Sequence, residues 1–260
     1  MKKTLALVLA LLALLAGCSS GSGGSSDKSS GTAKPKSSTL TVLAASSLTE
    51  TFGTLAKTFE KSHPGVHVRF SFDSSATLAE QVNQGAPADV LATADTKTMK
   101  TVTDAGGTTS KPQLFASNTL VLVVPKSNPA HIKTFSDVTK PGVSYVMCVT
   151  TAPCGSLTQT LLDANHVTAK PKSQEVDVKS VLSKVELGEA DAGFVYASDA
   201  KSAAGKVDPV TIPKTDQYVN EYPIATLKNT KDAALAKDWV SLVLSTHGQK
   251  VLQDAGFGKP

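Results

Sequence analysis

The chain has 260 residues, of which 40% are hydrophobic and 18% are charged. This balance excludes a chain that is disordered throughout and a polytopic membrane protein, and the length allows one large globular core or two moderate ones. The formal charge of +4 falls to +2 once Lys2 and Lys3 are assigned to a removable leader. Because no basic run lies near aromatic residues, we expect no binding to nucleic acid.

Residues 1–17 have the pattern of a signal peptide. A basic start precedes an apolar run from Leu5 to Ala16, which is too short for a stable membrane span. Leu15-Ala16-Gly17-Cys18 then resembles the bacterial lipobox, in which the cysteine becomes the acylated first residue. We therefore expect an extracytoplasmic protein that is anchored to the membrane by lipidated Cys18. The alternative is an ordinary cleavage site that leaves Cys18 free.

Residues 18–38 connect this anchor to the rest of the chain. After Cys18 they are nearly all Ser, Gly, Lys and Thr, a composition that buries too little surface to order itself. Twenty such residues have a root-mean-square reach of roughly 25 Å. We interpret this segment as a flexible tether.

Strands and helices alternate along the first part of the globular region. A strand over Leu40–Ala45 runs through two serines into a helix, and Ser47 and Glu50 have the Ser-x-x-Glu spacing of a capping box. A second strand, residues 66–72, leads through Ser74 and Ser75 into a helix that carries the similar pair Thr77 and Glu80. A third strand, 89–94, precedes a helix that Asp95 caps. This order predicts a parallel sheet with helices on both faces.

The pattern repeats further along the chain. The expected strands are 118–124, 143–149, 192–196 and 224–227. A proline at position 153 indicates the start of one helix, and Asp177 can cap another that begins near Val178. Two more helices are expected near the C-terminus. The sequence therefore predicts two α/β lobes, one formed by residues 39–117 plus 221–260 and the other by 118–220, with a ligand cleft between them.

Cys148 and Cys154 remain as an even pair once Cys18 is assigned to lipid. In an oxidising compartment such a pair predicts a disulfide that closes a small loop, and two buried thiols are the alternative. A metal site is not expected, because the cysteines lack partner ligands and Pro64-Gly65 breaks any helix that would align His63 with His67.

The two serine turns predict a site for an anion. Each combines a helix N-terminus with hydroxyl groups, and neither turn contains lysine or arginine. Helix dipoles and neutral hydrogen bonds can hold an oxyanion at such a place. The plain alternative for either turn alone is an ordinary helix cap.

Several motifs, in order along residues 39–258, resemble the molybdate-binding proteins of ABC transporters. They are Ala45-Ser46-Ser47-Leu48-Thr49, Phe72-Asp73-Ser74-Ser75-Ala76-Thr77-Leu78-Ala79, Gly85-Ala86-Pro87-Ala88-Asp89-Val90, Gly193-Phe194-Val195-Tyr196-Ala197-Ser198-Asp199-Ala200 and Glu221-Tyr222-Pro223-Ile224. The resemblance implies the two-lobed type II periplasmic-binding-protein fold. It also implies a monomeric, non-enzymatic receptor that binds molybdate or tungstate without a cofactor and delivers it to an ABC permease driven by a cytoplasmic ATPase.

The resemblance further implies which groups hold the oxyanion. Ser47 and Ser75 would donate through hydroxyl and backbone N–H, Cys154 and Val178 through backbone N–H, and Tyr196 through its phenol. All are donors, as a fully deprotonated dianion requires. Two positions depart from the family pattern: Asp73 brings a carboxylate close to Ser75, and Cys154 replaces a small apolar residue.

Other functions remain as alternatives. A receptor for another tetrahedral oxyanion, such as sulfate, thiosulfate or phosphate, would use the same fold, although monoprotonated phosphate needs an acceptor that this donor set lacks. A serine hydrolase is a distant alternative, because no Gly-x-Ser-x-Gly motif is present. Tyr196 can also be read as an ordinary half-buried tyrosine.

Overall fold

Two five-stranded sheets carry the fold of residues 38–260, the part of the chain that the computed structural model describes. Strand order is β2-β1-β3-β10-β4 in the first sheet and β7-β6-β8-β5-β9 in the second. The predicted signal peptide, the lipidated Cys18 and nearly all of the tether lie outside the described residues. The predicted α/β class, with two sheets flanked by helices, is confirmed.

In each sheet, four strands run in the same direction and one runs opposite to them. The strands are β1 (Ser38–Ala45), β2 (Val66–Asp73), β3 (Val90–Ala92), β4 (Gln113–Asn118), β5 (Leu120–Pro125), β6 (Tyr145–Cys148), β7 (Ser173–Glu175), β8 (Ala192–Tyr196), β9 (Val207–Val210) and β10 (Asn220–Thr226). β10 runs antiparallel to both of its neighbours in the first sheet, and β5 does so in the second. Both sheets are therefore mostly parallel, as expected.

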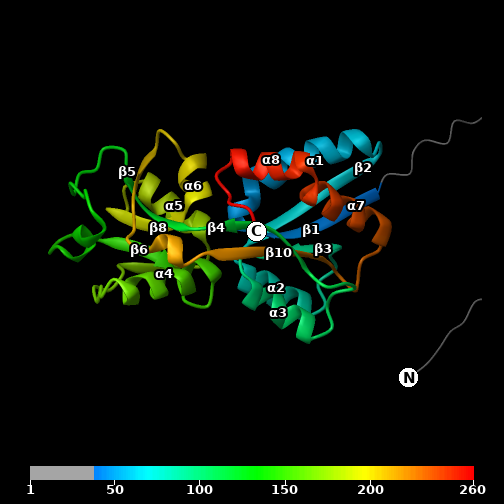
Figure 1. Ribbon diagram of the computed structural model, residues 1–260, viewed down its shortest axis with the longest axis horizontal. Helices are drawn as coiled ribbons and strands as arrows, with labels where there is room; N and C mark the ends of the chain where they lie inside the picture. The colour runs from blue at the N-terminus through cyan, green and yellow to red at the C-terminus, as the bar shows by residue number, and fades with distance from the viewer. Residues whose placement is uncertain (1–37) are drawn as a thin grey trace, which may run out of the picture. The chain divides into compact units, whose positions relative to one another are not determined.

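Helices cover both faces of each sheet (Figure 1). The α-helices are α1 (Thr49–Ser62), α2 (Ser75–Asn83), α3 (Thr96–Asp104), α4 (Pro153–Ala164), α5 (Val178–Glu186), α6 (Ala197–Ser202), α7 (Ala233–Leu244) and α8 (Thr246–Asp254), and the 3-10 turns are η1 (Ser46–Leu48), η2 (Phe135–Thr139) and η3 (Thr215–Gln217). In the first sheet, α2 and α3 lie on one face, and α1, α7 and α8 lie on the other. Within residues 38–260, no helix has the length and apolar character needed to cross a membrane.

The chain passes from one sheet to the other over a single residue. β4 ends at Asn118 and β5 begins at Leu120, so only Thr119 separates them. The strand predicted over 118–124 is confirmed as β5 except at its start, since residue 118 is the end of β4, a strand of the other sheet that was not predicted. The return is made by β10, which pairs with β4 and places Asn220 opposite Asn118. We keep the predicted lobe boundaries as a proposal.

The sequence reasoning missed elements that carry little apolar patterning. β7 has the sequence Ser-Gln-Glu, and β9 contains Pro209. Both lie at edges of the second sheet, where short polar strands and proline are tolerated. Their place was set by pairing with neighbours rather than by local pattern.

Aromatic side chains fill the core beside the first sheet. The Trp239 ring packs edge-on against Phe52 and Phe59, with ring centroids 5.4 Å apart in each pair, and Phe52 also contacts Phe115. The three Phe rings and Trp239 are fully or almost fully buried. This cluster joins α1 and α7 to the sheet, so it supports the strand end from which α1 departs.

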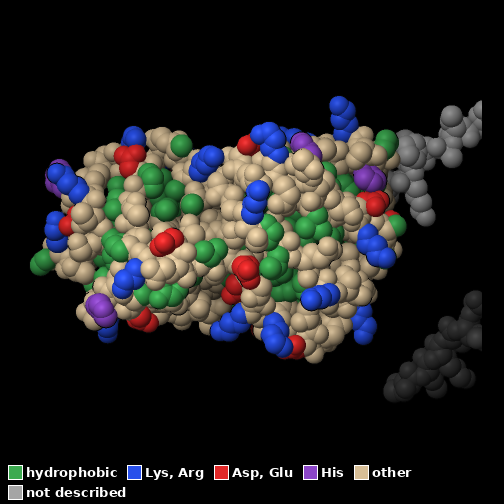
Figure 2. All heavy atoms as spheres, in the orientation of Figure 1, with side chains coloured by type: hydrophobic (Ala, Val, Ile, Leu, Met, Phe, Trp, Pro, Cys, Tyr) green, Lys and Arg blue, Asp and Glu red, His purple; other side chains and the backbone are tan. Residues whose placement is uncertain are grey.

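Charged side chains of both signs are interspersed over the face shown in Figure 2, with small apolar areas between them. On that face the charges do not gather into a patch of one sign.

Replacing Phe52 with alanine should lower the free energy of unfolding by about 3–5 kcal/mol, because it removes a buried ring and leaves a cavity. Urea denaturation measures this change. Leu187→Ala is the control: that side chain is 73% exposed, so the change should stay within about 0.5 kcal/mol of the wild type. Equal effects of the two substitutions would contradict the role of the aromatic cluster.

Candidate functional site

A small pocket lies where strand ends and helix starts of both sheets meet. Its lining residues are Ala45, Ser46, Ser47, Asp73, Ser74, Ser75, Ala94, Pro153, Cys154, Asp177, Val178 and Tyr196. All five residues predicted for the oxyanion site are among them, although they come from five separate segments of the chain. The cavity volume is about 10 Å³. One water molecule needs roughly 10–15 Å³, so the pocket in this arrangement excludes an organic solute.

Ser47 lies in the 3-10 turn between β1 and α1, and its side chain is not a helix cap. The predicted capping box with Glu50 does not form. Instead, the Ser47 hydroxyl lies 3.0 Å from the Tyr222 hydroxyl, and either group can be the donor. When Tyr222 donates, the Ser47 proton stays available to the pocket. Glu50 is drawn away by an ion pair with Lys179, which explains why the sequence pattern was misleading.

Ser75 is the first residue of α2, two residues before the predicted Thr77–Glu80 pair. Its Oγ accepts a hydrogen bond of 2.9 Å from the backbone N–H of Ala94. Because an oxygen that accepts keeps its own proton, the Ser75 hydroxyl remains a donor. The side chain is 1% exposed.

Ser74 is a polar group that the sequence reasoning did not assign. Its Oγ is buried, lines the same pocket and has no hydrogen-bond partner in the structure. A buried hydroxyl without a partner costs about 1–3 kcal/mol, so this position favours a polar ligand. Asp73 also lines the pocket, and its Oδ1 accepts a hydrogen bond of 2.6 Å from the Ser74 backbone N–H. One oxygen of the Asp73 carboxylate is therefore already hydrogen-bonded to the backbone.

Cys154 is the second residue of α4, after Pro153, which occupies the expected place in the first turn. The predicted disulfide to Cys148 is present, with the two Cα atoms 5.8 Å apart. Gly155 adds a second restraint, since a Cβ there would lie 2.0 Å from the Val149 carbonyl oxygen. The turn that carries the Cys154 amide is therefore held by a covalent bond and by close backbone packing.

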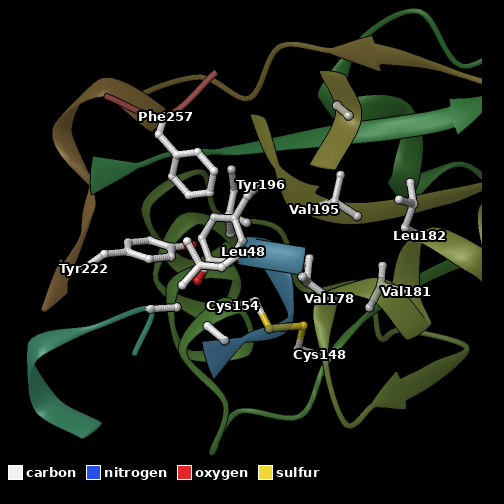
Figure 3. Close-up of a cluster of buried hydrophobic side chains, with 14 of the residues drawn as sticks. Leu48, Cys148, Cys154, Val178, Val181, Leu182, Val195, Tyr196, Tyr222 and Phe257 are labelled. Atoms are coloured by element: carbon white, nitrogen blue, oxygen red, sulfur yellow. A yellow bond between two sulfur atoms is a disulfide. The ribbon is translucent and has the colours of Figure 1, made fainter. Parts of the chain in front are cut away.

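Val178 and Tyr196 complete the predicted set. Asp177 caps α5 as predicted by accepting from the Ser180 N–H, and Val178 follows it with its side chain in the core. Tyr196 ends β8 and is 1% exposed, so it is fully buried and not half-buried as the alternative reading expected. Figure 3 shows the rings of Tyr196, Tyr222 and Phe257 grouped on one side of the disulfide.

Several helix starts at the pocket lack a side-chain cap. The helices that begin there after β1, β2 and β6 have no side-chain cap hydrogen bond, whereas α5, which also begins there, is capped by Asp177. The helices α3, α7 and α8 begin elsewhere, and the side chains of Asp95, Asp232 and Ser245 cap them. The first N–H groups of an α-helix need partners, so the uncapped ends leave donors available to an anion.

One lysine lies beside the pocket, but it is already paired. The Lys179 ammonium lies 2.8 Å from the Glu50 carboxylate and 3.1 Å from that of Asp199. Burial of Asp199 raises the pKa of its carboxyl to about 6, although Lys179 acts in the opposite direction. Glu50 belongs to α1 and Lys179 to α5, so this ion pair connects helices that flank different sheets.

Burial also raises the pKa of Tyr196 and that of Tyr222. The hydrogen bond from Asn220 lowers the pKa of Tyr196 in part. Both phenols therefore stay protonated at neutral pH. The pocket accordingly offers backbone N–H groups and neutral hydroxyl groups, which together can hold a small oxyanion by hydrogen bonds alone.

Residues 40–258 match the family model of the bacterial extracellular solute-binding proteins. The chain belongs to this family. Among its relatives, the molybdate-binding protein ModA of Mycobacterium tuberculosis is 44% identical over 221 residues, which cover 85% of each chain. YvgL of Bacillus subtilis, whose name proposes an ABC transporter substrate-binding lipoprotein, is 32% identical over 98% of each chain.

Solved structures of solute-binding proteins share the fold. The periplasmic molybdate-binding protein of Azotobacter vinelandii superposes with a TM-score of 0.75 at 23% identity, covering 85% of this chain and 99% of that one. The sulfate-binding protein SubI of Mycobacterium tuberculosis has a TM-score of 0.74 at 20% identity, covering 85% and 86%. At these identities the likeness establishes the two-lobed fold of the family and leaves the choice of solute open.

Proposed function

We propose that this solute-binding protein is the molybdate receptor of an ABC transporter, that it also binds tungstate, and that it delivers the oxyanion to a membrane permease. The observation that carries the proposal is the pocket itself, in which uncapped helix starts and protonated hydroxyl groups from both sheets converge. The 44% identity to a protein named for molybdate binding supports the same ligand.

We assign the oxyanion to Ser47, Ser75, Cys154, Val178 and Tyr196. The two serines and the tyrosine contribute hydroxyl donors, and backbone N–H groups come from the helix starts. Hydrogen bonds to a charged group contribute roughly 1.5–3 kcal/mol each, so five to seven of them support about micromolar to nanomolar affinity after ordering costs. No lysine or arginine is among the residues that line the pocket.

Sulfate is the main alternative ligand, since it has the same charge and shape as molybdate and a sulfate-binding protein shares the fold. Size separates the two anions, because molybdate is larger. The cavity of about 10 Å³ is smaller than either requires, so binding needs a small separation of the lobes from this arrangement. Relatives named for molybdate favour the larger ion.

Donors from both lobes make the ligand a link between them. Ser47 and Ser75 lie beside the first sheet, and Cys154, Val178 and Tyr196 lie beside the second. A ligand that contacts both groups binds the closed arrangement more tightly than an open one and shifts the population toward it. A permease can then distinguish loaded from empty receptor by shape.

We further propose that the receptor is monomeric and that Cys18, behind a signal peptide, carries the lipid that holds it at the membrane. The lipobox-like Leu15-Ala16-Gly17-Cys18 and a relative whose name proposes a lipoprotein support this anchor. The 20 residues after Cys18 would let the lobes reach a permease in the same membrane.

Molybdate and tungstate should raise the thermal midpoint of the protein strongly, and sulfate and phosphate should raise it weakly. Ligand at 100 times its dissociation constant adds about 2.7 kcal/mol to the free energy of unfolding. A thermal-shift series with the four anions at matched concentration measures this order. A shift with sulfate as large as that with molybdate would contradict the assigned ligand.

Ser75→Ala should weaken molybdate binding by about 1–3 kcal/mol, because the variant lacks one hydroxyl donor to the anion. Titration calorimetry measures the change, and circular dichroism checks the fold. Ser183→Ala is the matched control, since Ser183 is exposed on α5 away from the pocket lining. Unchanged affinity of Ser75→Ala would remove that residue from the site.

Cys18→Ser should release the protein from the membrane fraction, because a serine cannot take the thioether-linked lipid. Cell fractionation with an antibody against the protein measures the distribution. Molybdate binding by the released protein should equal that of the wild type, since residue 18 precedes the globular region. Membrane retention of Cys18→Ser at the wild-type level would contradict the lipid anchor.

A further inference from the structure

Asn220 is a residue of β10 that does not line the pocket but contacts one that does. We propose that Asn220 is a positioning residue that fixes the Tyr196 hydroxyl as a donor toward the ligand, and that it thereby sets the preference for fully deprotonated oxyanions. This inference rests on the function proposed above.

The orientation of the Asn220 amide follows from its two contacts. Its Nδ2 atom lies 2.7 Å from the Tyr196 hydroxyl oxygen and 3.4 Å from the backbone carbonyl oxygen of Pro153. A carbonyl oxygen can only accept, so the NH₂ group must be the part of the amide that faces this side. The NH₂ group can only donate. The Tyr196 oxygen therefore accepts from Asn220.

An accepting phenol keeps its one proton for another partner. Tyr196 lines the pocket, so an oxyanion there is the natural acceptor. Burial raises the pKa of the phenol, which holds the proton on Tyr196 at neutral pH. The same logic applies at Ser75, whose Oγ accepts from the Ala94 N–H and so presents its proton.

This polarity has a consequence for ligand choice. A fully deprotonated dianion has only acceptor oxygens and fits a pocket of fixed donors. A monoprotonated oxyanion, such as hydrogen phosphate, brings an O–H group that needs an acceptor. If the Tyr196 proton turned away from the pocket, the phenol oxygen would supply that acceptor. Asn220 prevents a turn toward β10, because its NH₂ group offers Tyr196 a donor and no acceptor. Besides a ligand, the Tyr222 hydroxyl is the other hydrogen-bonding group beside the phenol.

The position of Asn220 in the fold keeps its amide in place. Its backbone lies opposite Asn118 in the β10–β4 ladder of the first sheet, whereas its side chain contacts Tyr196 and Pro153 beside the second sheet. The side chain of Asn118 also reaches the second lobe, where it donates a hydrogen bond of 2.8 Å to the Ser198 hydroxyl. Asn118 of β4 and Asn220 of β10 thus connect the first sheet to the segment of the second lobe that carries Tyr196.

Asn220→Asp tests the proposal, because it replaces a donor with a carboxylate of nearly the same shape. The ionised carboxylate accepts the Tyr196 proton and turns it from the ligand, so molybdate affinity should fall about 10- to 100-fold at neutral pH. Binding of phosphate relative to molybdate should rise. When the introduced carboxyl is protonated it can donate to Tyr196 again, so the loss should shrink as the pH is lowered.

The pH profile is taken as the ratio of variant to wild-type affinity, over the range in which molybdate stays deprotonated. The other ionisable groups around the pocket and the phenol are Asp73, Asp95, Asp177, Asp199, Tyr222, Glu50 and Lys179. Lys179 pairs with both Asp199 and Glu50. The wild type contains all of them, so the ratio isolates residue 220.

Two further variants separate positioning from a general structural role. Asn220→Asp in a Tyr196→Phe background should change molybdate affinity less than threefold, because no phenol proton remains to be turned. Asn220→Leu removes the donor without adding an acceptor, so it should weaken binding less than Asn220→Asp. Its loss should also vanish in the Tyr196→Phe background, which keeps the test valid if Asn220→Asp fails to fold.

The outcomes are distinct. If the wild-type protein fails to bind molybdate, the proposed function is wrong. Wild-type protein that binds molybdate, with Asn220→Asp binding it equally well at all pH values, would overturn the role of Asn220 alone. An equal loss with and without the Tyr196 phenol would also overturn it, since Asn220 would then act by another route.

Discussion

The backbone N–H groups at helix starts are the constraint on which this structure depends. An α-helix leaves its first N–H groups without partners inside the helix, and most helices here that begin away from the pocket cover this need with an Asp or Ser side chain. The turns after β1, β2 and β6 do not, and they open toward one pocket. The fold of the two lobes serves to bring these open donors together. In the function we propose, the bound oxyanion accepts hydrogen bonds from these N–H groups.

Hydroxyl groups around the pocket extend the same principle. Two of them are held by a fixed donor that decides where the hydroxyl proton points: the Ala94 N–H for Ser75 and the Asn220 amide for Tyr196. Ser47 shares a hydrogen bond with Tyr222 in which either hydroxyl can donate. The Lys179 ammonium stays paired with Glu50 and Asp199. A site whose donors are all uncharged selects by the direction of hydrogen bonds and by size. A lysine or arginine in the pocket would attract any anion of suitable charge.

Much of the fold could be predicted from the sequence, because apolar strands, Asp caps and Pro153 leave local signals. The candidate site residues came from the serine turns and from the family motifs. The features that could not be predicted depend on contacts between segments that are distant in the sequence. Ser47 and Glu50 match a capping box by spacing, yet both side chains bind partners from far along the chain. Asn220 has no motif of its own, and its proposed role follows only from the hydrogen bond that it makes with Tyr196, a residue distant in the fold's other sheet.

The turn between Cys148 and Gly155 links the shape of the pocket to the compartment in which the protein matures. The Cys154 amide, which we propose to bind the oxyanion, is held partly by a covalent bond that is typical of an oxidising compartment. The same chain in a reducing cytosol would lack this bond and keep only the close packing of Gly155 against Val149. Oxidation after export would then complete the shape of the proposed binding turn.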